Sequence, residues 1–113
     1  MTQEQTRLAV QEIVARCRVE TLKEILLKLY NRQLIRERVE GRASFADGKG
    51  FNRLDAPLLM RISVGIKDRE ELGPVQEEIV RQKLAKYWQQ IAAEIDVVKE
   101  WTFIDGPQAE LFQ

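Results

Sequence analysis

Few side chains of this 113-residue chain have the types and spacing that catalysis requires. The chain has no histidine, which removes the commonest general base and the commonest metal ligand. Its single cysteine, Cys17, stands between Arg16 and Arg18, which could lower the thiol pKa; without a base partner, we expect a half-buried structural thiol. The carboxylate pairs Glu70–Glu71 and Glu77–Glu78 are adjacent in sequence rather than facing. We therefore expect a protein that is not an enzyme, with no metal and no cofactor.

The glycine-rich stretch 41–54 could offer backbone amides to a phosphate. It lacks the Gly-x-x-x-x-Gly-Lys-Ser/Thr pattern, and no strong apolar strand precedes it. We interpret it as an ordered loop that lets Phe51 reach the core, with Phe45 and Leu54 as further anchors. A weaker interpretation has its amides and Lys49 contact a nucleic-acid phosphate.

The sharpest local signal is the C-terminal pentapeptide Gln108-Ala109-Glu110-Leu111-Phe112. In an extended peptide, Gln108 can form hydrogen bonds while Leu111 and Phe112 enter a hydrophobic cleft, which removes two large apolar side chains from water. The pentapeptide resembles the motif by which bacterial DNA polymerases and repair proteins dock on the β sliding clamp: Gln first, an acidic or small polar residue third, then Leu-Phe. That family prefers Leu second, so Ala109 implies weaker binding. The alternative is that Leu111 and Phe112 fold back onto the domain.

A second resemblance lies in the middle of the chain, over about residues 30–95. It rests on these residues: Tyr30-Asn31-Arg32-Gln33, Asp47-Gly48-Lys49-Gly50-Phe51-Asn52, Asp55-Ala56, Gln76, Lys86-Tyr87 and Gln90-Ile91. Together they resemble a helical module of bacterial and phage DNA-processing proteins, where it accompanies helicase or primase parts. Gly73-Pro74 departs from the Ser/Thr start expected for its last helix. The resemblance implies a setting and no defined activity.

Basic side chains concentrate in the first half of the chain. The 18 basic and 18 acidic groups cancel overall, but residues 1–56 hold 11 basic against 8 acidic groups and residues 57–113 hold 7 against 10. A neutral total argues against a protein that coats nucleic acid over its whole surface. The candidate nucleic-acid contacts are Arg32, Arg36, Arg38, Arg42, Lys49 and Arg53. Interspersed glutamates leave a solvated helix face as the alternative.

Apolar spacing predicts an all-α fold of four helices. The longest expected helix runs from Leu72 to Val98, with Pro74 at its first position and apolar residues at steps of three or four. Its expected apolar stripe consists of Val75, Ile79, Leu84, Tyr87, Trp88, Ile91, Ile95 and Val98. We place Tyr87 and Trp88 in the core rather than on stacked bases.

The other expected helices start at capping signals. One starts at Thr2 with Gln5, one runs from Leu22 to about Val39, and a short one follows Asp55. A single helix over 3–39 is the competing interpretation, since no Gly or Pro enforces a break. Trp101, Phe103 and Ile104 could pack on the bundle or form a short strand. We expect a helical domain over 1–104 and an exposed tail over 105–113.

Composition bounds the setting. With 44% hydrophobic residues the chain can bury one modest core, and no apolar run approaches a membrane span. One cysteine and the lack of a signal-peptide pattern favour a reducing cytoplasm. We expect an accessory protein of bacterial or phage DNA metabolism that binds DNA or a protein partner through its basic half and the sliding clamp through its tail. The alternative is a structural helical subunit of a larger protein or nucleoprotein assembly without clamp contact.

Overall fold

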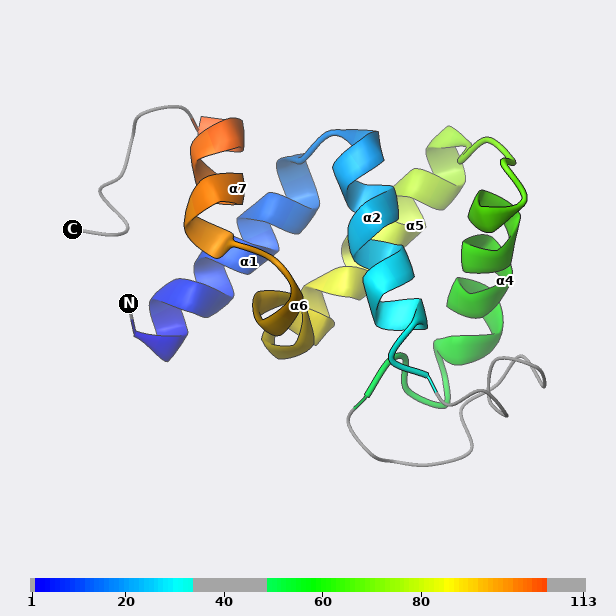
Figure 1. Cartoon of the computed structure of the whole chain (residues 1–113), viewed down its shortest axis with the longest axis horizontal. Coiled ribbons are helices and arrows are strands. Elements are labelled where there is room, and N and C mark those ends of the chain that lie inside the picture. Colours follow the sequence, from blue (N-terminus) through cyan, green and yellow to red (C-terminus); the bar gives the residue numbers. More distant parts are fainter. Residues whose placement is uncertain (1, 34–48, 106–113) are drawn as a thin grey trace.

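The computed structural model describes residues 2–33 and 49–105, and these are mostly helical, with no strand among them (Figure 1). In chain order the elements are α1 (Gln3–Arg16), α2 (Val19–Tyr30), α4 (Ala56–Lys67), α5 (Pro74–Leu84), the 3₁₀ turn η1 (Ala85–Tyr87), α6 (Trp88–Glu94) and α7 (Val97–Asp105). The all-α class is confirmed. Several predicted residues lie outside the described ranges: Arg36, Arg38, Arg42, Phe45, Gln108, Leu111 and Phe112.

Helix α1 starts as its sequence predicts. The Gln5 amide donates to Thr2 Oγ1 at 3.1 Å, and the Thr2 amide donates to Gln5 Oε1 at 2.8 Å. This reciprocal capping box satisfies two amides that have no partner inside the helix.

The break between α1 and α2 is formed by Cys17 and Arg18, which both have extended backbone. The competing single helix over residues 3–39 is therefore wrong. The second helix starts at Val19, before the expected start at Leu22, and ends at Tyr30 rather than near residue 39.

Arg81 of α5 stabilises this break from another part of the chain. Its guanidinium donates to the carbonyl oxygens of Val14 at 3.0 Å and Cys17 at 2.8 Å. These carbonyls lie at the end of α1, where intrahelical donors are missing. A salt bridge to Glu77, one turn earlier on α5, holds the guanidinium in place.

The expected continuous helix from Leu72 to Val98 is wrong, although Pro74 does start α5. The chain tightens into the 3₁₀ turn η1 after Leu84, and it breaks again at Ile95, whose backbone is extended. Asp96 then caps α7 by accepting the Lys99 amide at 3.1 Å. Trp101, Phe103 and Ile104 consequently lie on a helix rather than a strand.

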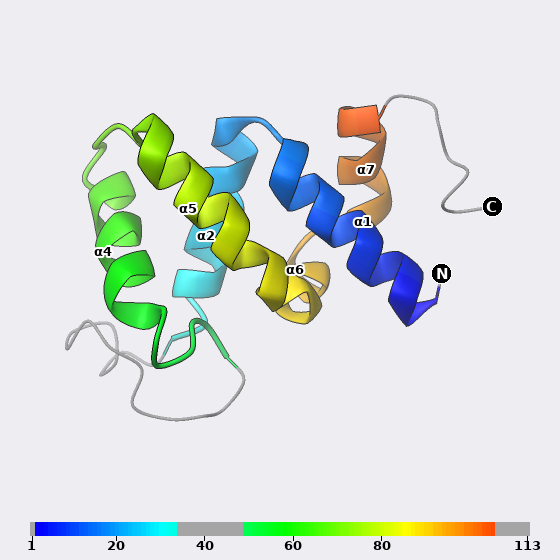
Figure 2. The ribbon, with the colours of Figure 1, turned by 180° about the vertical axis from the view of Figure 1, so that it is seen from behind.

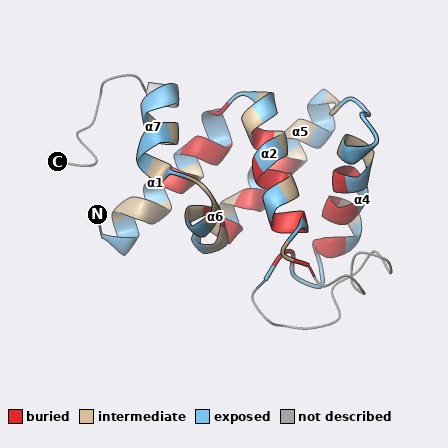
Figure 3. Cartoon of the chain, viewed as in Figure 1, coloured by how far each residue is buried: buried red, intermediate tan, exposed pale blue. Residues whose placement is uncertain are grey.

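The core lies between the helices (Figure 3). Helix α1 packs against α5, α6 and α7, while α2 packs against α4, α5 and α6; α4 and α7 lie at opposite ends of the molecule (Figure 2). The fully buried large side chains are Val10, Ile13, Val14, Leu22, Ile25, Leu26, Leu29, Leu59, Met60, Leu84 and Ile91. Each contributes about 1.5–3 kcal/mol by leaving water.

The exposures of the side chains confirm some of the predicted core residues and contradict others. Tyr87 and Phe51 are buried, as predicted, but Val75 is 74% exposed and Leu54 is 90% exposed. Val98 is also half exposed. The predicted stripe therefore overestimates the apolar face at both of its ends.

Candidate functional site

The most extensive polar network among the described residues ties the segment Gly50–Asp55 to the end of α2 and to η1 and α6. We call this network the loop clamp. Its members are Gln33, Gly50, Phe51, Asn52, Asp55, Tyr87 and Gln90. They come from three stretches of chain that lie far apart in the sequence.

Gly50 is held by a two-bond amide pair. Its N–H donates to Gln90 Oε1 at 2.6 Å, and Gln90 Nε2 donates back to the Gly50 carbonyl at 3.0 Å. The buried Gln33 side chain accepts the next amide, that of Phe51. Gly50 has φ +74°, and a β-carbon there would overlap the Gln33 side chain. Glycine is thus required both by the backbone conformation and by the close approach.

Tyr87 joins the other half of the clamp. Its hydroxyl donates to Asp55 Oδ2 at 2.6 Å and accepts the Asn52 amide at 3.0 Å. The Tyr87 ring meets the Phe51 ring edge-on, with centroids 6.0 Å apart. The 3₁₀ turn containing Tyr87 is thereby linked to the loop by both polar and aromatic contacts.

Asp55 is the charged centre of the clamp. It occupies the N-cap position of α4, as predicted, but its side chain makes no capping hydrogen bond. Instead, its carboxylate is 3% exposed and binds Lys83 at 3.2 Å and Lys86 at 2.8 Å, besides Tyr87. Asn52 Oδ1 accepts the Asp55 amide at 2.9 Å, which closes the turn.

The two titratable groups of the clamp are shifted in opposite directions. Burial raises the pKa of Asp55, but hydrogen bonds from Lys86, Tyr87 and Lys83 outweigh it, so the pKa lies below its usual value. Burial and the hydrogen bond to Asp55 both raise the pKa of Tyr87. At neutral pH the pair is therefore a carboxylate and a neutral phenol.

Three of the predicted nucleic-acid contacts lie in or next to the segments that form the loop clamp. Arg32 donates to the Gln90 carbonyl at 3.2 Å and lies 3.8 Å from Glu94, so it joins α2 to α6. Lys49 and Arg53 are exposed in or beside the clamped segment.

Sequence reasoning missed Lys83 and Lys86 as candidate contacts. Their three-residue spacing resembles an ordinary solvated helix face. In the sequence, Lys86 belongs to the helical-module resemblance, beside Tyr87, and Lys83 does not. Only the folded chain brings both lysines to Asp55.

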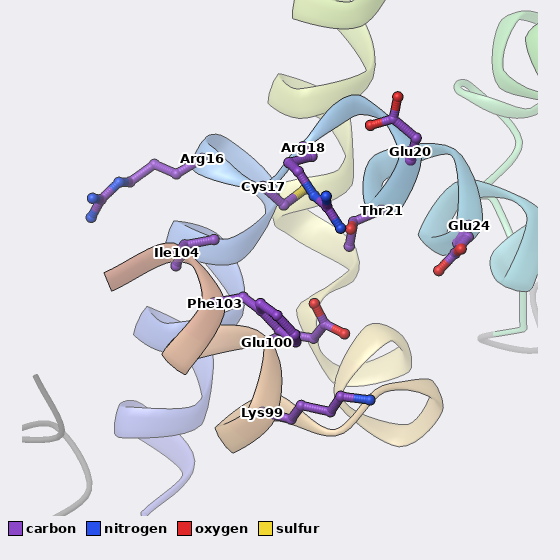
Figure 4. Close-up of a pocket in the computed structure, with 10 residues that line it drawn as sticks. All are labelled: Arg16, Cys17, Arg18, Glu20, Thr21, Glu24, Lys99, Glu100, Phe103 and Ile104. Atoms are coloured by element: carbon purple, nitrogen blue, oxygen red, sulfur yellow. The ribbon is translucent and has the colours of Figure 1, made fainter. Parts of the chain in front are cut away.

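A groove of about 470 Å³ lies between the α1–α2 corner and α7 (Figure 4). Its lining combines basic, acidic and uncharged side chains: Arg16, Cys17, Arg18, Glu20, Thr21, Glu24, Lys99, Glu100, Phe103 and Ile104. Cys17 is 4% exposed, more deeply buried than expected. Burial raises its thiol pKa, against the opposing effect of Arg81, whose Nη1 lies 3.8 Å from the sulfur. The thiol is therefore protonated at neutral pH and poorly suited to nucleophilic attack.

Comparison with protein-family models, curated proteins and solved structures finds no match to this chain. Among residues 2–33 and 49–105, no group of three or more His, Cys, Asp or Glu side chains could hold a metal ion. Within the same ranges, no helix combines the length and apolar content that crossing a bilayer requires.

Proposed function

We propose that this protein is a non-enzymatic accessory protein of bacterial or phage DNA metabolism. Its helical domain holds DNA or a protein partner, and residues 108–112 tether it to the β sliding clamp. The observation that carries the proposal is the composition of the loop clamp. All seven of its members belong to the residues that resemble the DNA-processing helical module, and they bond to one another across three distant stretches of chain. This supports interpreting them as parts of one folded module.

The internal use of these polar groups favours a binding role over a catalytic one. Both Asp55 oxygens accept from lysine or tyrosine, and the Tyr87 hydroxyl both donates and accepts. Groups engaged in this way fix the geometry of a loop rather than wait for a substrate. The exposed side chains next to them then form a rigid surface for a partner.

The positions of the elements suit a tethered protein. The Gly50–Asp55 segment of the loop clamp leads directly into α4, and α7, which precedes the tail, lies at the end of the molecule opposite α4 (Figure 1). A tail that starts there can bind the sliding clamp without covering the loop clamp. Such a tether would raise the effective concentration of the domain near DNA even if the peptide itself binds modestly. The proposed location is the cytoplasm, where the sliding clamp acts.

The tail is tested by binding to purified β sliding clamp in a surface-capture assay. Replacing Leu111 and Phe112 together by Ala should weaken binding by at least about 10-fold, because each side chain would bury about 1.5–3 kcal/mol of apolar surface. Ala109→Leu, which restores the residue preferred in the motif, should strengthen binding. Equal affinity of wild type and all variants, or a loss of helical circular dichroism in the double variant, would count against a free tail.

The second candidate function is a structural subunit of a larger assembly. The observation that favours it is the exposure of large apolar side chains on separate elements: Leu54 at 90%, Val75 at 74% and Phe103 at 70%. Affinity purification from the native host separates the two functions. An assembly subunit should co-purify with stoichiometric neighbours and show no sliding-clamp contact.

A further inference from the structure

Lys83 and Lys86 are gathered at the surface by one buried carboxylate. Lys83 binds Asp55 Oδ1 and Lys86 binds Asp55 Oδ2, while the lysine side chains remain 35% and 51% exposed. A lysine ammonium has three donors, and each lysine uses one of them on Asp55, so two donors of each remain beyond that bond. Because one carboxylate offsets only one of the two charges, the group has an excess positive charge beside the clamped turn.

Arg53 and Leu54 lie at the tip of this turn, which is held from both sides. The Asn52 amide donates to Tyr87, the Asp55 amide to Asn52 Oδ1, and the Ala56 amide to the Asn52 carbonyl at 2.9 Å. Arg53 is exposed and Leu54 is 90% exposed. A tip of fixed conformation loses little entropy when it binds, so its side chains can contribute more of their contact energy to affinity.

We propose that Arg53, Leu54, Lys83 and Lys86 form a surface, the tip face, that binds the backbone of a nucleic-acid strand. Arg53, Lys83 and Lys86 contact phosphates, and Leu54 packs on an adjacent sugar or base. A strand presents repeated anions beside apolar faces, which matches cations grouped around one projecting apolar side chain. A peptide that carries carboxylates alone, such as poly-glutamate, would match the cations but not Leu54. This inference rests on the proposed function and assigns its nucleic-acid contact to the tip face, which lies beside the loop clamp.

The test is fluorescence anisotropy with a labelled oligodeoxythymidylate of about 20 nucleotides and a duplex of the same length, at about 50–200 mM salt. Arg53→Gln, Lys83→Gln and Lys86→Gln should each weaken binding by about 3–10-fold at low salt. Each should also reduce the slope of log K against log salt by about 0.7–1, as expected for one lost phosphate contact. Leu54→Ser should weaken binding about 5-fold and leave the slope unchanged, because it removes a contact to a base or sugar.

Lys99→Gln is the matched control, since it removes the same charge from α7, which lies at the end of the molecule opposite α4 and carries no tip-face residue (Figure 1). It should change affinity by less than about 2-fold, because the screening length is only about 10 Å. If the lysine variants lose stability, Arg53→Gln still tests the inference, because Arg53 lies outside the hydrogen-bond network of the loop clamp.

Three results would overturn the inference. Equal effects of Arg53→Gln and Lys99→Gln would place the contact elsewhere and leave the proposed DNA role intact. Failure of the wild type to bind either oligonucleotide would remove the DNA role as well, but not the proposed sliding-clamp contact. Displacement of the oligonucleotide by poly-glutamate at equal charge concentration would assign the tip face to an acidic protein partner.

Discussion

Replacing Tyr87 by Phe should test whether the loop clamp stabilises the fold. The change keeps the ring, and therefore its contact with Phe51, but removes the hydroxyl that donates to Asp55 at 2.6 Å. Hydrogen bonds to charged groups contribute about 1.5–3 kcal/mol. The Asn52 amide also loses the Tyr87 oxygen as its acceptor, while Asp55 keeps both lysines, so we expect a loss of about 2 kcal/mol. For a domain of this size that corresponds to a fall in Tm of about 8 °C.

The assay is urea and thermal unfolding at pH 7, followed by far-ultraviolet circular dichroism. The urea midpoint should fall while the m-value stays constant, because the folded core is unchanged. A double-mutant cycle with Asp55→Asn should give a coupling energy of about 1–3 kcal/mol. A Tyr87→Phe loss below about 0.5 kcal/mol, or additive effects of the two substitutions, would refute the assigned hydrogen bond as a source of stability.

Three further predictions concern neighbouring groups. The pKa of Asp55 in the folded protein lies below its unfolded value of about 3.9. The stability that Asp55 adds to the fold is therefore complete above that pH and is lost as pH falls through the folded pKa. Asp55→Asn should flatten the acid limb of the plot of unfolding free energy against pH. Gly50→Ala should cost about 1–3 kcal/mol or more in urea unfolding, whereas Gly73→Ala, with nothing within 4 Å of the new β-carbon, should stay within about 1 kcal/mol. Arg81→Gln should lower the free energy of unfolding by about 1–3 kcal/mol, since it removes donors from the buried end of α1, while Arg61→Gln on exposed α4 surface should change it little.

The parts of the fold that the sequence predicted are those encoded by local signals. The Thr2–Gln5 capping box and the Pro74 start of α5 depend on residues within one helical turn. Helix α4 also starts after Asp55 as predicted, although the Asp55 side chain does not cap it. The apolar spacing also assigned Leu84 and Ile91 to the core correctly. Such signals can be recognised without knowing what packs against them.

The errors arose where a distant partner decides the local conformation. Apolar spacing through Tyr87 is compatible with a continuous helix, and only the contacts to Asn52 and Asp55 distinguish the 3₁₀ turn. Asp96 is a residue type that favours a helix N-cap, and it does cap α7. The apolar residues on both sides of it also fit an uninterrupted helix, so the sequence alone does not distinguish the two.

None of the loop-clamp residues was predicted as a site residue, and they are grouped in the sequence only by the helical-module resemblance. The resemblance grouped Gln33, Gly50, Asp55, Tyr87 and Gln90 without indicating that they bond to one another. The predicted basic surface, in contrast, relied on charge counts along the chain. That approach does not reveal that a guanidinium such as that of Arg32 is engaged with a neighbouring helix.

Asp55 links the stability of the domain to the charge that it shows to solvent. Its burial is unfavourable on its own, and Lys83, Lys86 and Tyr87 compensate for it. The same compensation positions two lysines beside a turn whose tip carries Arg53 and Leu54. A neutral residue in place of Asp55 would avoid the unfavourable free energy of burying a charge, but it would no longer hold Lys83 and Lys86 beside the turn. We infer that the carboxylate serves to position the tip face, since a buried ion pair is a weak source of net stability and this one binds both lysines beside the turn.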